Sequence, residues 1–474
     1  MPTIVRNQRN HYAAKQGPDR LPSGLRTMRR ADDKRELMPL GLDYSLSPSG
    51  LTTCHECDLL HHLTSIESGA SAFCTRCGAL LYREAPGGLN RPLALALAAL
   101  GLFIITNVYP FLTLNIEGRV ERNLVVSGIH ALWSFGMPEL SVLVALTSVV
   151  FPAITIIGLL WLVLSLKADM HPPGAALIVR IINAIGPWTL LSVFMLGTLV
   201  AFVKLQDIAT VIPGVAMFAF GALIVTTTAA ASSFDIGLIW PRVGPLGGDT
   251  ISSGDTAHLH GLQACHTCAL LVAPSTATGQ QHSNNTPNGY SMLDRLNCPR
   301  CTTPLHGARK HDSISRTWAL IFAALILIVP ANLYPVMTVI QFGQGEPNTI
   351  VSGVLHLIDE GMWGLALIVF VASVVLPVLK LLLLSYLLLS VQSRSTWRPR
   401  DRTRLYRITE VVGAWSMVDI YLIGILTALV NLQALASITP EIGASFFGAV
   451  VVVTMLAAHS FDPRLIWDHA VKAQ

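Results

Sequence analysis

Long apolar segments constrain the fold of this 474-residue chain more than any other feature. Stretches of 18 or more predominantly apolar residues recur along it, and a helix of about 20 such residues crosses the roughly 30 Å hydrocarbon core of a bilayer. Only 13% of the residues are charged and the mean hydropathy is +0.55, whereas soluble domains carry about 25% charged residues. The composition excludes a water-soluble globular protein and predicts an α-helical integral membrane protein.

The two halves of the chain repeat each other in register. Matching motifs stand 225 residues apart (332 minus 107) early in each half and 227 residues apart (461 minus 234) near its end. The pairs are Asn107–Pro110 with Asn332–Pro335, Val126–Gly128 with Val351–Gly353, Pro152 with Pro377, Trp188 with Trp415, and Phe234–Trp240 with Phe461–Trp467. Unrelated apolar helices do not hold register in this way, so we expect two tandem copies of one unit.

Each copy is expected to contain four membrane spans, eight in all. They are predicted near residues 92–110, 139–166, 177–203 and 214–233 in the first copy, and near 317–337, 362–390, 408–430 and 443–460 in the second. Because four is an even number, both copies should cross the membrane in the same direction, related by an axis along the membrane normal.

The distribution of lysine and arginine predicts the orientation. The loops after the first and third spans of each copy hold only Arg119, Arg122 and Lys204, whereas the N-terminal region, the central segment and the loop 392–407 hold most of the others. Cytoplasmic loops carry the excess of basic residues, so both termini and both cysteine-containing segments are expected in the cytoplasm.

The opposite, periplasmic loops show the alternation of short strands. We expect one small β-hairpin in each copy, with a possible added strand. The strand-like runs are 111–116 with 123–126, and 336–341 with 349–351; the possible additions are 205–212 and 432–439. Exposed strand edges at these positions could pair with a partner protein.

Four Cys-x-x-Cys pairs account for all eight cysteines. Their spacing predicts two zinc ribbons, the first ligated by Cys54, Cys57, Cys74 and Cys77, and the second by Cys265, Cys268, Cys298 and Cys301. Two facing turns make a tetrahedral four-sulfur site without an open coordination position, which favours structural zinc at both sites. A rubredoxin-like iron site and a redox-active dithiol are the alternatives. Since four sulfurs suffice, His55, His61, His62 and His266 are expected at the surface.

Two charged residues fall inside predicted spans of the second copy. Lys380 and Asp419 each lie twelve residues from a common boundary (380 to 392, and 407 to 419), about 18 Å at 1.5 Å per residue, so the two charges could meet. The aligned residues of the first copy are Thr155 and Ser192. Charges at such depth are costly, and either a structural ion pair or a polar site that lines a cavity or relays a proton explains them.

The Cys-x-x-Cys pairs, the Asn-x-Tyr-Pro motifs, Val-Ser-Gly, the mid-span proline and the terminal Phe-Asp together resemble the paraquat-inducible protein A family. The match covers most of residues 50–468. The resemblance implies tetraspanin-like four-helix units with an outer β-sheet, in a multi-pass protein of the bacterial inner membrane. It also implies a periplasmic MCE-domain tunnel protein as partner and phospholipid as cargo, with the polar residues of the spans falling on Lys380, Asp419, Thr155 and Ser192.

We therefore expect a transport component and not an enzyme, with no nucleic-acid partner; no P-loop motif is present. The alternatives are a non-transporting scaffold for the tunnel and a membrane-bound thiol redox or stress sensor. The expected domains are a basic disordered tail (1–48), zinc ribbon 1 (49–88), transmembrane unit 1 (89–240), zinc ribbon 2 with its linker (241–314), transmembrane unit 2 (315–468) and a C-terminal tail (469–474).

Overall fold

The structure is a computed structural model that describes residues 3–4, 45–46, 51–63, 66–83, 88–116, 119–170, 174–206, 210–235, 238–240, 254–260, 262–273, 297–298, 300–305, 312–341, 344–359, 361–429 and 436–468. The predicted C-terminal tail lies outside these residues, as does the predicted N-terminal tail apart from two short strands.

The chain divides into two compact units. The first comprises Met1–Cys54, Leu59–Glu84 and Val243–Ala308; the second comprises His55–Asp58, Ala85–Arg242 and Arg309–Gln474. All strands that surround the cysteine clusters belong to the first unit, and all long helices belong to the second. The predicted boundaries of the individual ribbons and bundles stay predictions.

The first unit consists of short antiparallel strands. β3 (Leu51–Thr53) pairs with β4 (Leu60–His62), β5 (Ser71–Phe73) pairs with β6 (Leu80–Arg83) and β1 (Thr3–Ile4), and β11 (Leu271–Ala273) pairs with β10 (Gln263–Ala264) and β2 (Ser45–Leu46). The amide of Leu60 donates to the carbonyl of Asp255 at 2.8 Å. A small apolar core holds Leu51 and Leu60 from the first ribbon with Ala257, Leu262 and Leu271 from the second. The two ribbons thus fold as one body.

Among its described residues, the second unit contains eight helical segments long and apolar enough to cross a membrane, as predicted. They are α1 (Asn90–Val108), α3 to α4 (Pro138–Lys167), α5 to α6 (Ala175–Val203), α7 (Val215–Ser233), α8 (Ser313–Leu333), α10 to α11 (Trp363–Gln392), α12 to α13 (Pro399–Ala428) and α14 (Ile442–Ser460). The predicted boundaries agree to within four residues except in the seventh, which begins at Pro399 instead of near 408. Its first turns carry several arginines, which concealed them from a search for apolar residues.

The same irregularities interrupt both copies. A π-helical turn, Leu146–Val150, precedes α4 (Phe151–Lys167), and its equivalent Val371–Val375 precedes α11 (Leu376–Gln392). Each ends two residues before a proline, Pro152 or Pro377, whose missing N–H and ring disturb the helical hydrogen bonds of the preceding turn. The third spans contain 3₁₀ turns at Gly186–Trp188 and Ala414–Met417. The two copies therefore repeat each other in the positions of their π-helical and 3₁₀ turns as well as in sequence.

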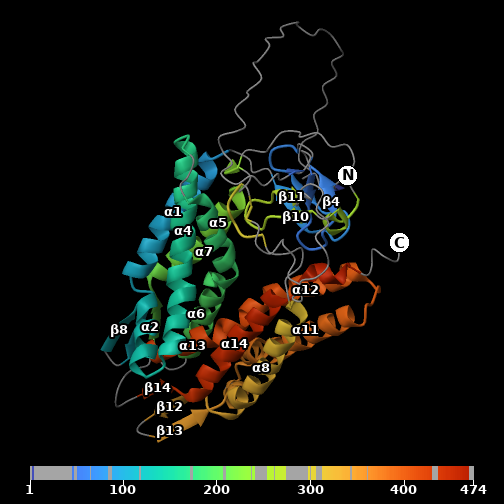
Figure 1. The fold of residues 1–474 in the computed structure, drawn as a ribbon. Coiled ribbons are helices and arrows are strands. Elements are labelled where there is room, and N and C mark those ends of the chain that lie inside the picture. The colour runs from blue at the N-terminus through green and yellow to red at the C-terminus, as the bar shows by residue number, and fades with distance from the viewer. Residues whose placement is uncertain are drawn as a thin grey trace, which may run out of the picture. The chain divides into compact units, whose positions relative to one another are not determined.

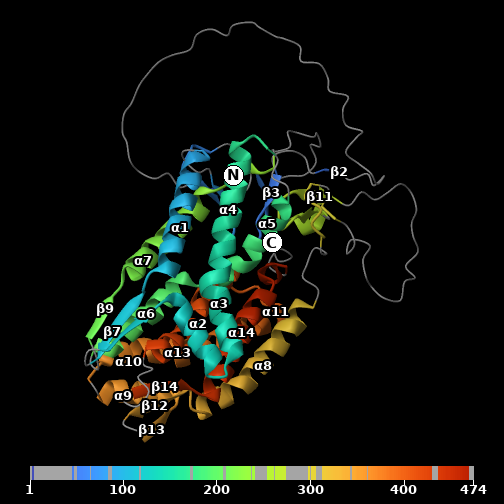
Figure 2. The ribbon, with the colours of Figure 1, turned by 90° about the vertical axis from the view of Figure 1, so that its left-hand side faces the viewer.

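Each copy also forms a three-stranded sheet, with order β8-β7-β9 in the first and β13-β12-β14 in the second. The strands are β7 (Leu112–Ile116), β8 (Arg119–Asn123), β9 (Thr210–Pro213), β12 (Met337–Gln341), β13 (Gln344–Asn348) and β14 (Ala436–Pro440). Within the second unit, the sheets lie at the same end of the helices (Figures 1 and 2). The hairpins and added strands are confirmed; the side of the membrane that they occupy stays a prediction.

The strands expected at 123–126 and 349–351 were wrong in their extent. Helices begin there instead: α2 (Val125–Ser134) and α9 (Ile350–Asp359). The amide of Leu124 donates to Ser127 Oγ at 3.0 Å, and the amide of Thr349 donates to Ser352 Oγ at 2.9 Å. These N-terminal caps, supplied by the serine of each Val-Ser-Gly motif, start a helix where β-branched residues alone favour a strand.

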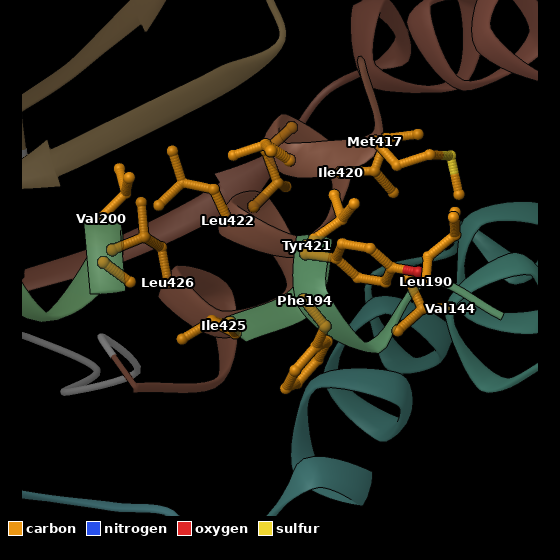
Figure 3. Packing of buried hydrophobic residues seen from close by; sticks show 14 of the residues in the cluster. Val144, Leu190, Phe194, Val200, Met417, Ile420, Tyr421, Leu422, Ile425 and Leu426 are labelled. Atoms are coloured by element: carbon orange, nitrogen blue, oxygen red, sulfur yellow. The ribbon is translucent and has the colours of Figure 1, made fainter. Parts of the chain in front are cut away.

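The two copies share one apolar core in which α13 (Val418–Leu429) is central. It packs against α6 (Leu191–Gln206) and α2 of the first copy. Figure 3 shows Tyr421 of α13 beside Phe194 and Leu190, and its hydroxyl donates to Thr147 Oγ1 at 2.7 Å. A Cβ on Gly197 would stand 3.1 Å from the Val418 carbonyl oxygen, so glycine permits the close approach of α6 and α13. We call the whole contact surface between the two copies the seam.

Candidate metal centres and the intramembrane cavity

Four turns of the same geometry present the cysteines. In each, the amide of the first cysteine donates to the carbonyl five residues later: Cys54 to Leu59, Cys74 to Ala79, Cys265 to Leu270 and Cys298 to Thr303, at 2.8–3.0 Å. The residue after the second cysteine has a positive φ in all four, namely Asp58, Gly78, Ala269 and Thr302. Only one of these is glycine, although the left-handed conformation favours glycine. The turns thus hold both thiols of each pair on one side.

The sulfur atoms form two clusters suited to a metal ion. Within each predicted set of four, the Sγ atoms lie within 4.8 Å of one another, and all eight cysteines are buried. The Sγ atoms of Cys54 and Cys77 lie 3.4 Å apart, as do those of Cys265 and Cys301. A tetrahedral zinc site with Zn–S bonds of about 2.3 Å has sulfurs about 3.8 Å apart, so only a small expansion is needed. The donor sets fit two four-sulfur sites.

The surroundings of the clusters differ from the prediction at one residue. His61 is not at the surface: it is 3% exposed, and its Nε2 lies 3.2 Å from Cys74 Sγ. It lies on β4, directly after a buried leucine, where the pairing with β3 turns it towards the cluster. An N–H directed at a ligand sulfur is a common second partner of metal-bound groups.

In the second cluster, hydrogen bonds from the thiols of Cys268 and Cys298 lower the pKa of the Cys265 thiol.

Lys380 lies inside the second bundle, on α11. The residue is 2% exposed, and no hydrogen bond or ion pair of its ammonium is found among the residues that the structure describes. Its Nζ occupies the space beside Gly413, at the end of α12 (Pro399–Gly413), where an added Cβ would stand 2.4 Å from it. A side chain at position 413 is therefore incompatible with this position of the ammonium.

Lys380 lines a cavity of about 340 Å³ at the seam between the copies. The first copy contributes the interrupted part of its third span, and the second copy contributes α11, α12 and α14. The lining residues are Pro187, Thr189, Leu190, Ser192, Val193, Lys380, Glu410, Val411, Trp415, Met455, Ala458 and His459. Val411 and Trp415 are 67% and 51% exposed, so the cavity borders on apolar surface of the membrane helices.

The structure brings two of the four predicted polar residues to this cavity, Lys380 and Ser192. Asp419 lines a separate cavity of about 50 Å³. Thr155 donates to the carbonyl of Phe151 at 2.9 Å within its own helix. The predicted meeting of Lys380 and Asp419 is not found, because Lys380 is level with Gly413 and Asp419 lies six residues further along, about 9 Å at 1.5 Å per residue. The equal depth of Lys380 and Asp419 was predicted because the start of the seventh span was placed near residue 408 and not at Pro399.

Comparison with known proteins separates the same two membrane copies. A profile of the paraquat-inducible protein A family matches residues 89–244 and 314–471, one match for each membrane copy. The chain belongs to this family. The two matches exclude the ribbons, so they confirm the tandem arrangement of the bundles independently of the cysteines.

Curated relatives extend the similarity to almost the whole chain. An intermembrane transport protein PqiA of Escherichia coli is 30% identical over 89% of this chain and 96% of its own length. The lipophilic envelope-spanning tunnel protein A of E. coli is 30% identical over 88% of this chain and 90% of its own. A probable intermembrane transport protein of Haemophilus influenzae is 27% identical over 89% and 96%. No solved structure matches the chain.

Sequence reasoning missed several residues of the cavity. Glu410 and His459 were not recognised as neighbours of Lys380, because they come from other helices. Gly413 carried a usable signal: a glycine inside a helical segment often marks a close approach. The 3₁₀ turn at Gly186–Trp188 carried another, since its proline interrupts an otherwise apolar span.

Proposed function

We propose that this protein is the inner-membrane component of an intermembrane phospholipid transport system. In this role it passes lipid to or from a periplasmic MCE-domain tunnel protein. The relatives named as intermembrane transport and tunnel proteins support the transport role. The eight membrane spans provide the location from which lipid is taken or delivered.

One observation carries the proposal: a cavity inside the membrane unit combines a buried ammonium with an apolar rim. Phospholipids need both, since the headgroup is polar and the acyl chains are not. Lys380 provides the charge, and the exposed side chains of Val411 and Trp415 provide the apolar border. A purely structural charge has no need of an adjacent cavity.

The sheets support the partner assignment. β8 and β13 are edge strands, each with one neighbour in its sheet. An edge strand can pair with a strand of another protein. With the predicted orientation, both sheets face the periplasm, where the tunnel protein would dock. Both termini and the ribbons are then cytoplasmic, and zinc in the two four-sulfur sites would hold the ribbons together.

Lipid transfer tests the proposal directly. Purified full-length protein in liposomes, supplied with its MCE partner, should move fluorescent phospholipid to acceptor vesicles. Replacement of Lys380 by methionine should reduce the rate at least tenfold, whereas Thr155→Val should not. Equal rates with and without the protein would contradict transport.

The side of the membrane is tested by labelling. Arg122, on β8 of the first hairpin, and Arg400, in the first turn of the seventh span, are both exposed. In spheroplasts, a membrane-impermeant maleimide should label Arg122→Cys and not Arg400→Cys. The reverse pattern would invert the topology and place the sheets away from any periplasmic partner.

The redox-sensor alternative has less support. Reactive thiols are partly exposed and lie near positive charge. Here every cysteine is buried and clusters with three others. The scaffold alternative predicts that only the sheets matter, and the Lys380→Met variant distinguishes it from transport.

A further inference from the structure

The cavity at the seam is lined by Lys380, a buried lysine for which the described residues supply no hydrogen bond or ion pair. We propose that the cavity binds the phosphate of a phospholipid headgroup, with Lys380 as the ligand, and that it favours a headgroup that also carries an amine. This inference rests on the proposed lipid-transport function and names the class of substrate.

Burial of the ammonium is the first argument. A charged amine is costly in a membrane interior unless an opposite charge or strong acceptors compensate it. Among the described residues, Lys380 has no hydrogen bond or ion pair, yet it is 2% exposed. Gly413 leaves the space that Nζ occupies. The site is shaped to hold the charge in place, and an anionic ligand would supply the compensation.

The interrupted third span of the first copy is the second argument. The helix α6 starts at Leu191, after the 3₁₀ turn Gly186–Trp188, and the residues around this start line the cavity. The first amides of a helix lack partners within it and carry a partial positive charge, so they attract anions. Broken helices of membrane transporters present such ends to bound anionic groups. The part of the cavity wall formed by the start of α6 is thus also suited to a phosphate.

The dimensions and rim favour a lipid over a soluble phosphate. Ligand pockets usually measure about 300–1,000 Å³, and this cavity of about 340 Å³ has room for a headgroup and not for a whole phospholipid. Val411 and Trp415 at the cavity are exposed apolar residues of the membrane helices. Acyl chains can therefore stay in the hydrocarbon while the headgroup enters from the side.

Glu410 determines which headgroup fits. Its side chain is exposed and lines the same cavity, three residues before Gly413 on α12. A carboxylate disfavours a second anionic group and attracts an ammonium. A zwitterionic headgroup such as phosphoethanolamine matches this pair of charges, with its phosphate at Lys380 and its amine at Glu410. A headgroup with phosphate alone matches only half of it.

Native mass spectrometry of the full-length protein tests the site. The protein is incubated with phosphatidylethanolamine, phosphatidylglycerol or glycerol 3-phosphate. We expect phosphatidylethanolamine to bind at least tenfold more tightly to the unaltered protein than to Lys380→Met, and Thr155→Val to bind like the unaltered protein. Glycerol 3-phosphate should not compete at millimolar concentration. Equal lipid binding by Lys380→Met, or tight binding of glycerol 3-phosphate alone, would overturn the assignment.

Two more measurements keep the test independent of folding and of transport. Lys380→Met removes a buried charge, so we expect the lipid-free variant to melt at a temperature no lower than the unaltered protein. If Lys380 instead stabilised the fold, the melting temperature of the variant would fall. Glu410→Gln should reduce the preference for phosphatidylethanolamine over phosphatidylglycerol; an unchanged preference would overturn the amine assignment. A Lys380→Met variant that binds lipid normally but does not transfer it would refute this site and leave the transport function intact. If the variant loses lipid binding but the unaltered protein does not transfer lipid, transport would be refuted and the binding site would stand.

Discussion

The two membrane bundles share one fold but not one environment. Their π turns, 3₁₀ turns, capped short helices and three-stranded sheets recur at offsets of 225 to 228 residues (371 minus 146; 414 minus 186). Yet 76% of the third span's most apolar window is buried in the second copy, compared with 44% in the first. The fourth spans differ in the same direction, 56% against 28%.

The difference shows how a duplicated unit acquires a specialised half. The second copy supplies the centre of the shared core through α13, and it alone carries Lys380 and Asp419. The first copy has Thr155 and Ser192 at these positions, and Ser192 lies at the cavity of the other copy's lysine. One copy thus provides the charge and the other provides part of the wall.

The largest expected effect compares the two ribbons. Cys57→Ser and Cys268→Ser each remove one of four sulfurs, and structural zinc contributes about 10–16 kcal/mol to the folding of small domains. Each variant should therefore lose its own metal, lowering the content from two ions per chain to one by elemental analysis. A chain that keeps both metals would contradict the four-sulfur sites. Loss of both would show that the shared core of Leu51, Leu60 and Leu271 makes the ribbons interdependent.

The next largest effect should come from placing a lysine in the first copy at the position equivalent to Lys380. Thr155→Lys places an ammonium in the first copy, where Thr155 is bonded within its own helix and lines neither of the two cavities described above. The expected destabilisation is about 3 kcal/mol, the cost of a lysine at the centre of a membrane helix. Thermal unfolding in detergent measures it, with Thr155→Val as control. An unaffected Thr155→Lys variant would show that the copies tolerate charge equally.

Two equivalent glycines distinguish the copies by packing. A Cβ on Gly128 would stand 3.1 Å from the Gly424 carbonyl oxygen across the seam, whereas a Cβ on Gly353 meets nothing within 4 Å. Gly128→Ala should destabilise the protein by about 1–3 kcal/mol through overpacking. Gly353→Ala should stabilise it by about 0.5–1 kcal/mol through reduced chain entropy. Equal shifts in the unfolding temperature would mean that the seam is absent in solution.

The smallest expected effect again concerns the ribbons. Gly78 and Ala269 occupy the same left-handed position of equivalent turns, with φ of 74° and 54°. The left-handed conformation costs a non-glycine residue about 1–2 kcal/mol. Part of this cost is offset because glycine loses more conformational entropy on folding. Gly78→Ala should therefore destabilise its ribbon by about 1 kcal/mol, and Ala269→Gly should stabilise the other by at most that. Chelator titration of metal release detects both, and shifts of the same sign would contradict the shared turn geometry.

Much of the architecture could be predicted because it is local. Span lengths follow from runs of apolar residues, and the metal sets follow from Cys-x-x-Cys spacing, so both appear in the sequence. The cavity depends on the packing of helices that are far apart in sequence: Lys380 lies beside Gly413, and Ser192 of the first copy lines the same cavity. Residue counts gave the depth of Asp419 incorrectly because Arg400, Arg402 and Arg404 belong to the seventh span. His61 was misplaced because only the pairing of β3 with β4 turns it inward.

Cryo-electron microscopy of the protein in phosphatidylethanolamine nanodiscs would test the central claim most directly. We expect the two bundles to meet along α13 and α6, with headgroup density beside Lys380 Nζ and acyl density leaving between Val411 and Trp415. A map in which Lys380 is paired with a protein carboxylate, and side chains fill the space beside it, would contradict the account.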